Sequence, residues 1–178
     1  MTLAHRAFAL DYAAFEQQLR PLLLRALETD DPAALEAWID GNVAALVDPY
    51  EGEPLPANWR KQLENGDVHE LGDYALTKFY DGDLDMGLDV DWERLAELLE
   101  KSGSSGALLL GSQLGAAERE FDPGRQGAYF QSPGEVKAGL AELRALLEAQ
   151  PALASDLAPV QGMLQQAARN GHGLFVTF

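Results

Sequence analysis

Apolar residues return at helical spacing along most of this chain. One face of an amphipathic helix is apolar because its residues recur every three or four positions. The clearest case follows Ser132, where Val136, Leu140, Leu143 and Leu147 fall on one face. The same pattern predicts a mostly helical protein, with helices over segments 11–27, 32–46, 57–64, 67–80, 91–101, 132–150 and 157–170.

Several residues set where these helices begin, bend or stop. Ser132 and Glu135 have the spacing of a capping box, in which each side chain accepts a hydrogen bond from the other residue's amide. Pro133 then takes the first helical position, where its missing amide hydrogen costs nothing. Pro21 lies inside the first helical stripe, so we expect a kink or two helices end to end. Segment 48–56 contains three prolines and a glycine, which predicts a loop where the chain changes direction.

Four short apolar runs predict β-strands. They are Ala7–Leu10, Ala107–Leu110, Ala128–Phe130 and Leu174–Phe178. The last run is β-branched and aromatic, as strands prefer, and its apolar side chains need cover, so we expect it to pair inside a sheet. The length of 178 residues is typical of one domain. The sequence therefore predicts a single helix-rich α+β domain over residues 1–178, with a small sheet of three to four short strands.

The chain is strongly acidic. Its 29 Asp and Glu residues outnumber its 13 Lys and Arg residues, and the formal net charge is −16. Such a surface repels the phosphate backbone of nucleic acids and attracts basic proteins. We therefore expect no nucleic acid partner and favour a basic protein partner. The alternative is that the charge serves solubility alone.

Composition also excludes several kinds of site and location. The chain has no cysteine, which excludes disulfides, thiol nucleophiles and cysteine–zinc sites. No apolar run approaches the length that spans a bilayer, and none of signal-peptide type follows residues 1–6. These observations predict a cytoplasmic protein with no membrane partner.

An acidic run over residues 81–91 is the most conspicuous polar feature. Asp81, Asp83 and Asp85 alternate like the first three ligands of an EF-hand, whose loop then requires Gly at its sixth position and Glu at its twelfth. Here Met86 and Trp92 occupy those positions, so we predict no metal site. The run is then either a solvated loop or a docking surface for a basic partner, formed by Asp81, Asp83, Asp85 and Asp89.

No complete catalytic motif is present, which favours a non-enzymatic role without a cofactor. Segment 106–112 has the glycines of a phosphate-binding loop but lacks its lysine. No Gly-x-Ser-x-Gly elbow occurs, and the three histidines are scattered. Gln113, Arg125 and Tyr129 lie in one neighbourhood of the chain and could line a small ligand pocket.

Three stretches resemble the YfbM-like family, a bacterial family of small α+β proteins of unknown function. They are Leu-Asp-Val-Asp-Trp-Glu-Arg-Leu at 88–95, Ala-Leu-Leu-Leu-Gly-Ser at 107–112 and Gly-Ala-Tyr-Phe-Gln-Ser-Pro-Gly-Glu-Val at 127–136. The ending at 167–176 is similar in layout, with a helix that turns into a terminal strand. The chain departs from the family at the family's Leu-Gly-Gly run, where it has Leu-Gly-Ser, at Gly134, and across the helical region from Thr29 to Asp81. The resemblance implies an α+β fold and a cytoplasmic bacterial protein, and it implies no active site.

Two functional hypotheses follow from these patterns. The first is a non-enzymatic binding protein, such as an immunity or antitoxin-like protein, whose acidic surface engages a basic protein. The alternative is a small-molecule-binding protein or enzyme with a pocket at the sheet edge, near Gln113, Arg125 and Tyr129. The sequence predicts no oligomeric state.

Overall fold

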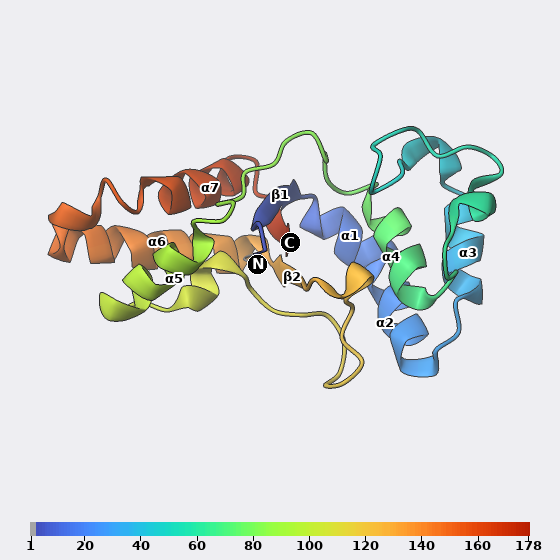
Figure 1. Ribbon diagram of the computed structural model, residues 1–178, viewed down its shortest axis with the longest axis horizontal. Helices are drawn as coiled ribbons and strands as arrows, with labels where there is room; N and C mark the ends of the chain where they lie inside the picture. The colour runs from blue at the N-terminus through green and yellow to red at the C-terminus, as the bar shows by residue number, and fades with distance from the viewer. Residues whose placement is uncertain (1–2) are drawn as a thin grey trace.

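A three-stranded antiparallel sheet lies at the centre of the molecule, between two groups of helices (Figure 1). The computed structural model describes residues 3–178. The strands are β1 (Arg6–Leu10), β2 (Ala128–Gln131) and β3 (Gly173–Thr177), in the order β1-β3-β2. Phe175 of the C-terminal strand lies opposite Phe8 on one side and Phe130 on the other. The prediction of an α+β fold with the terminal run inside a sheet is therefore confirmed.

Seven α-helices of the described residues cover the two faces of this sheet. One group consists of α1 (Tyr12–Gln18), α2 (Arg20–Thr29), α3 (Ala33–Asp40) and α4 (Val68–Leu76). The other consists of α5 (Trp92–Lys101), α6 (Pro133–Ala149) and α7 (Ala158–Arg169). Figure 1 shows the first group on the right and the second on the left, with the C-terminus beside the sheet. None of the helices over residues 3–178 is long and apolar enough to cross a membrane.

The sheet divides the apolar core into two clusters. Successive residues of a strand point to opposite faces, so each strand supplies side chains to both clusters. Phe8, Phe130 and Phe175 join the cluster that α1–α4 cover. The cluster that α5–α7 cover receives Ala7, Leu174 and Val176. One short sheet thus serves as the shared wall of both halves of the core.

Local signals start several helices where the sequence predicts. The Ser132 hydroxyl accepts from the Glu135 amide at 3.2 Å, and the Glu135 carboxylate accepts from the Ser132 amide at 2.6 Å, which is the predicted capping box at the start of α6. The stripe over 11–27 forms two helices end to end, α1 and α2, with Pro21 in the first turn of α2. The Asp11 carboxylate caps α1 by accepting from the Ala14 amide.

The predicted strand Ala107–Leu110 is wrong. This run forms a 3₁₀ turn, η3 (Gly106–Leu109), which begins where the Ser105 hydroxyl accepts a hydrogen bond from the Ala107 amide. Leu108 and Leu109 are buried in the second cluster without any strand pairing. Only Ser112, beyond the run, forms a bridge with Phe130. The sheet of the described residues therefore has three strands.

Three predicted helices are shorter than their apolar patterns suggest. The stripe over 32–46 is helical only to Asp40 and then forms the 3₁₀ turn η1 (Val43–Ala45). The segment 57–64 contains only the 3₁₀ turn η2 (Trp59–Gln62). Helix α4 ends at Leu76 rather than at Tyr80.

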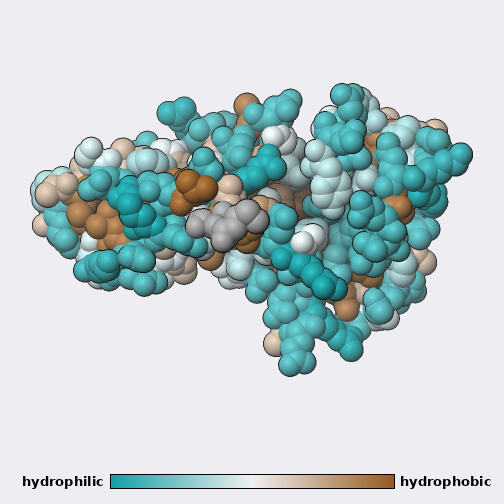
Figure 2. Space-filling view, in the orientation of Figure 1, coloured by the Kyte–Doolittle hydropathy of each residue, from teal (hydrophilic) through white to brown (hydrophobic). Residues whose placement is uncertain are grey.

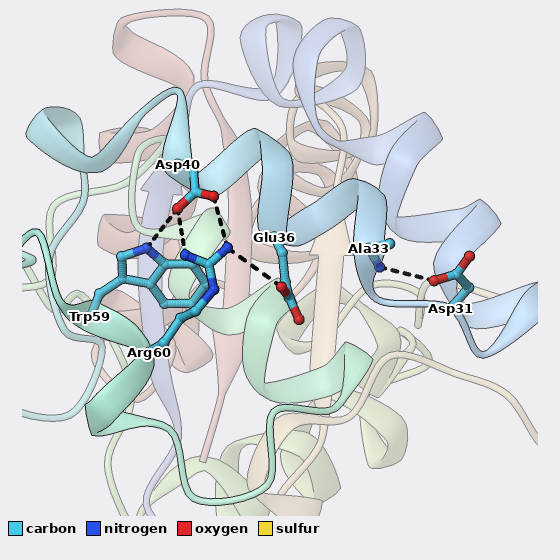
Figure 3. A network of polar contacts seen from close by, with 6 residues as sticks. All are labelled: Asp31, Ala33, Glu36, Asp40, Trp59 and Arg60. Atoms are coloured by element: carbon cyan, nitrogen blue, oxygen red, sulfur yellow. Dashed lines mark hydrogen bonds and ion pairs between the residues drawn. The ribbon is translucent and has the colours of Figure 1, made fainter.

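An exposed polar network holds the irregular segment 41–66 against α3 (Figure 3). The Arg60 guanidinium donates to both carboxylate oxygens of Asp40, at 2.8 and 2.7 Å. The indole of Trp59 donates to the same carboxylate at 3.1 Å, while its ring is fully buried in the first cluster. The Arg60 and Trp59 hydrogen bonds lower the pKa of Asp40. Side-chain hydrogen bonds to α3, and not the predicted α-helix over 57–64, thus hold this segment in place.

Gly173 and Gly162 provide a matched test of packing at the sheet. A Cβ on Gly173 would lie 2.2 Å from the carbonyl oxygen of Gln131, whereas a Cβ on Gly162 inside α7 meets nothing within 4 Å. We expect Gly173→Ala to lower the free energy of unfolding by about 1–3 kcal/mol through overpacking. Gly162→Ala should raise it by about 0.5–1 kcal/mol, because Ala favours helix. Urea unfolding followed by circular dichroism measures both values, and equal effects would contradict the close approach at β3.

Candidate functional site

A pocket with an aromatic floor lies on the α1–α4 side of the sheet, where β1 begins and β3 ends. We call it the aromatic pocket; its volume is about 570 Å³. Three rings form the floor: Tyr80 lies 4.9 Å from Phe8 and 5.2 Å from Phe175 between ring centroids, and Phe8 and Phe175 are 6.2 Å apart. Ligand pockets are commonly concave and apolar, with a few polar groups that converge on the bound molecule. This pocket has the size and the apolar base of such a site.

Asp73 of α4 supplies the polar group in the wall of the aromatic pocket. Only 9% of the residue is exposed, although it lines the pocket. No lysine or arginine forms an ion pair with it among the described residues. Its hydrogen-bonding neighbour is the hydroxyl of Tyr50. Asp73 is therefore a buried carboxyl group without a cation beside it.

This environment changes the acidity of Asp73. Burial raises its pKa to about 7, and the nearby carboxylates of Asp48 and Glu70 act in the same direction, while the Tyr50 hydroxyl opposes them. Burial disfavours the charged form because the carboxylate loses its hydration. Asp73 therefore changes its protonation state near neutral pH, as acid–base groups and ligand-binding carboxyls at functional sites do.

A tight loop holds Tyr50 at the mouth of the pocket. The Asp48 carboxylate accepts from the amides of Tyr50 at 2.7 Å and of Glu51 at 3.1 Å. The Thr77 hydroxyl, just after α4, accepts from the Val47 amide at 3.2 Å and donates to the Tyr74 carbonyl at 2.7 Å, so the loop is fixed to the helix that carries Asp73. The Tyr50 side chain is nevertheless 66% exposed. The loop thus presents an aromatic ring to solvent beside the buried carboxyl.

Two further phenols lie near this carboxyl, Tyr80 in the lining of the pocket and Tyr74 behind the loop at Asp48. Burial, and next the charge of Asp73, raise the pKa of Tyr80 above its ordinary value. Tyr74 donates its hydroxyl hydrogen to Asp48 at 3.3 Å, and burial also raises its pKa. Both phenols stay protonated at neutral pH, and Tyr80, which lines the pocket, can donate a hydrogen bond to an acceptor there.

The acidic run 81–91 forms a strap that leads from α4 toward α5 past the edge of the sheet (Figure 1). Asp81 and Asp83 lie at the rim of the aromatic pocket and are exposed. Asp85 instead binds the chain itself, since its carboxylate accepts from the Arg6 guanidinium at 3.1 Å and from the Ala7 amide at 3.0 Å. Asp89 is exposed on the far part of the strap, with a left-handed backbone at φ 53°. The four predicted docking residues therefore do not form one group. Asp81 and Asp83 lie at the pocket, Asp85 has a structural role, and Asp89 lies away from the pocket.

His5 fastens the strap to the rest of the fold. Its Nδ1 accepts a hydrogen bond from the Leu88 amide at 3.2 Å, so Nε2 carries the proton and donates to the Leu109 carbonyl at 2.9 Å. The backbones of His5 and Asp89 also pair as an isolated bridge. Burial lowers the pKa of His5, which keeps the ring neutral in this arrangement. The strap is thus held at a defined place on the sheet.

The predicted ligand residues Gln113, Arg125 and Tyr129 do not come together in one pocket. Gln113 and Arg125 line a polar depression beside His69 and Glu70. Tyr129 packs against the cluster that α5–α7 cover, with its ring 6.3 Å from that of Phe178. Tyr129 points away from the other two because it lies on a strand whose next residue, Phe130, faces the first cluster.

The described residues contain no group of three or more His, Asp or Glu side chains placed to hold a metal ion. Asp73, Tyr50 and Tyr80, which help to build the aromatic pocket, do not stand out in the sequence pattern. One signal was present: Asp73 lies in an apolar helical segment, where an acid is unusual unless it is paired or functional. The loop that brings Tyr50 to Asp73 has no periodic pattern of apolar residues from which its fold could be predicted.

Comparison of the chain with protein-family models, with curated proteins and with solved structures finds no match. The resemblance to the YfbM-like family therefore stays a prediction from the residues alone. Function must then be argued from the chemistry of the site, because a fold by itself implies none.

Asp73→Asn tests the charge state of the buried carboxyl. A folded-state pKa raised to about 7 means that the folded protein keeps a proton that the unfolded chain releases from about pH 4 upward. The wild type therefore loses stability relative to Asp73→Asn as the pH rises from 4 to 7. We expect the variant to be more stable by about 2–4 kcal/mol at pH 8 and nearly equal near pH 4.

Chemical unfolding at several pH values measures this difference. Asp83→Asn is the matched control, because it removes the same charge from an exposed position of the strap. A stability difference between Asp73→Asn and the wild type that stays constant from pH 4 to 8 would show that the folded and unfolded carboxyl groups titrate alike.

Proposed function

We propose that this chain is a non-enzymatic binding protein that engages a basic protein partner. The docking surface consists of the exposed strap carboxylates Asp81, Asp83 and Asp89 together with the rim of the aromatic pocket. The observation that carries the proposal is the position of the strap: it is acidic, exposed and fastened to the sheet at His5 and Asp85. A fixed charged surface costs little ordering on binding.

Apolar side chains accompany the charges on the strap. Leu84 and Val90 each leave 59% of their surface exposed, beside Asp83 and Asp89. Asp85 and Asp91, on their other sides, pair with Arg6 and Arg94. Charge complementarity accelerates encounter and selects partners, while apolar contacts supply affinity at the centre of an interface. The strap offers both kinds of contact within one short segment.

The overall charge supports the same function. A formal net charge of −16 produces a long-range field that attracts cationic proteins and repels nucleic acids. Hydrophilic residues cover most of the face shown in Figure 2, and apolar residues gather mainly at the end formed by α5 and α6. An immunity or antitoxin-like protein in the cytoplasm, which neutralises a basic partner, is one concrete form of this proposal.

A second candidate function is the binding or conversion of a small molecule in the aromatic pocket. The observation in its favour is Asp73, a carboxyl that titrates near neutral pH at the edge of a cavity of about 570 Å³. This candidate keeps the predicted place at the sheet edge but uses Asp73 and Tyr50 rather than Gln113, Arg125 and Tyr129.

Capture of basic proteins by the immobilised chain tests the first function. A triple variant with Asp81→Asn, Asp83→Asn and Asp89→Asn removes three strap charges, and asparagine tolerates the left-handed backbone at position 89. We expect the wild type to retain basic proteins from a native bacterial lysate at low ionic strength and to release them at high ionic strength. The strap variant should retain at least about tenfold less.

A charge-matched control separates the strap from net charge. Glu16→Gln, Glu93→Gln and Glu148→Gln remove three exposed carboxylates from helices α1, α5 and α6. This control should retain basic proteins almost as the wild type does. Equal losses in both triple variants, or no basic protein on the wild type, would eliminate the strap as a docking surface.

A further inference from the structure

The aromatic floor already carries a cation in this structure. The guanidinium of Arg6 lies 5.2 Å from the centre of the Phe8 ring. It is also paired with Asp85 at 3.1 Å, at the edge of the strap. A guanidinium or ammonium group within about 6 Å of an aromatic face is attracted by the ring quadrupole. The chain's own arginine thus shows that this floor accommodates a side-chain cation.

Negative charge dominates the lining of the pocket. Arg6 is the one basic residue among the side chains that line it, and five carboxyl groups accompany it: Asp48, Glu51, Asp73, Asp81 and Asp83. Four of these five lie at the rim in wholly or partly exposed positions. Asp73 is the exception, because it is nine-tenths buried and lacks an ion-pair partner. An unpaired buried carboxyl is costly, and a cation that entered the pocket would lower that cost.

We propose that the aromatic pocket receives a lysine or arginine side chain of the basic partner, with its cation against Asp73 and its aliphatic stem over Phe8, Tyr80 and Phe175. This inference rests on the proposed function, since it names the anchor of the same docking surface. A volume of about 570 Å³ holds an organic side chain rather than a bare ion. One deeply inserted charged residue, surrounded by weaker contacts, is how many interfaces concentrate their affinity.

Continuity of the surface favours a protein as the source of the cation. Asp81 and Asp83 belong both to the strap and to the rim of the pocket. Tyr50 also lines the pocket, with 66% of the residue exposed. A polypeptide that binds the strap would pass the pocket mouth, so one of its side chains could enter while its backbone stays outside. A small free cation would leave the strap and Tyr50 without a role.

Insertion of a cation is coupled to proton release from Asp73. The groups that face this carboxyl are Tyr50 and Asp48 from the loop, Glu70 from α4 itself and Tyr80 from just before the strap. Arg6 lines the same pocket from β1 but is held by Asp85. A cation beside Asp73 favours its charged form, so it opposes the effect of burial. The affinity for the cation should then increase by about tenfold between pH 6 and pH 8.

Three blocked amino acids test the pocket directly: acetyl-arginine amide, acetyl-lysine amide and acetyl-citrulline amide. Citrulline has nearly the shape of arginine without its charge, so it measures the contribution of the cation alone. NMR titration of the labelled protein, with the amides of segments 47–52 and 73–83 as reporters, gives the dissociation constants. We expect the arginine or lysine probe to shift these amides and the citrulline probe to bind at least about tenfold more weakly.

Variants identify the groups that bind the probe. Asp73→Asn should weaken cation binding at pH 8 at least about tenfold and abolish its pH dependence. Tyr50→Ala changes an exposed residue, so it should fold normally and still weaken binding. Glu16→Gln, on the outer face of α1, should bind the probe as the wild type does. Citrulline binding as tight as arginine binding, or pH-independent binding that survives Asp73→Asn, would overturn the assignment.

Failure of the capture experiment can be distinguished from failure of the probe titration. If the wild type captures basic proteins through the strap but neither cationic probe shifts the pocket amides, the anchor is wrong and the docking surface stands. If the probes bind through Asp73 but no basic protein is captured, the proposed function is wrong, and with it the protein source of the cation. Both results must be positive for the inference to hold.

Discussion

The pairing of β3 between β1 and β2 is the constraint on which the rest of the structure depends. Strand side chains alternate, so the placement of Phe175 opposite Phe8 and Phe130 decides which residues enter each of the two clusters. A slip by one residue would exchange the faces and leave both helix groups without their partners. The close approach of Gly173 to Gln131 helps to fix that register. The floor of the aromatic pocket is built from this same pairing.

Placing helices on both faces of so small a sheet forces the chain to cross its edge. The connection from α4 to α5 makes one of these crossings, and the acidic strap is that connection (Figure 1). A crossing segment has little core of its own, so polar contacts such as those of His5 and Asp85 hold it. The exposed docking charges therefore follow from the topology, because the strap must run over the surface to join the two halves.

The predictability of each element depended on whether its signal was local. The capping box at Ser132 and the terminal strand were predictable, because both are decided by residues adjacent in sequence. The run Ala107–Leu110 was not, since a short apolar segment between glycines satisfies burial equally well as a turn. Most residues of the candidate site could not be predicted from the sequence. Asp81 and Asp83 belong to an acidic run that is visible in the sequence. The environment of Asp73 forms only when the loop bearing Tyr50 folds against α4.

Two buried acids on α4 show why Asp73 stands out. Glu70 is 7% exposed, and its carboxylate accepts from three successive backbone amides, those of Glu64, Asn65 and Gly66, at 2.7 to 2.8 Å. Its charge is satisfied by the fold, so it has a structural role. Asp73, three residues later, has no amide cluster and no cation, but it has a cavity in front of it. The fold gives Asp73 one hydroxyl neighbour and no cation, so of the two acids it is the one that remains open to a cationic group from outside the chain.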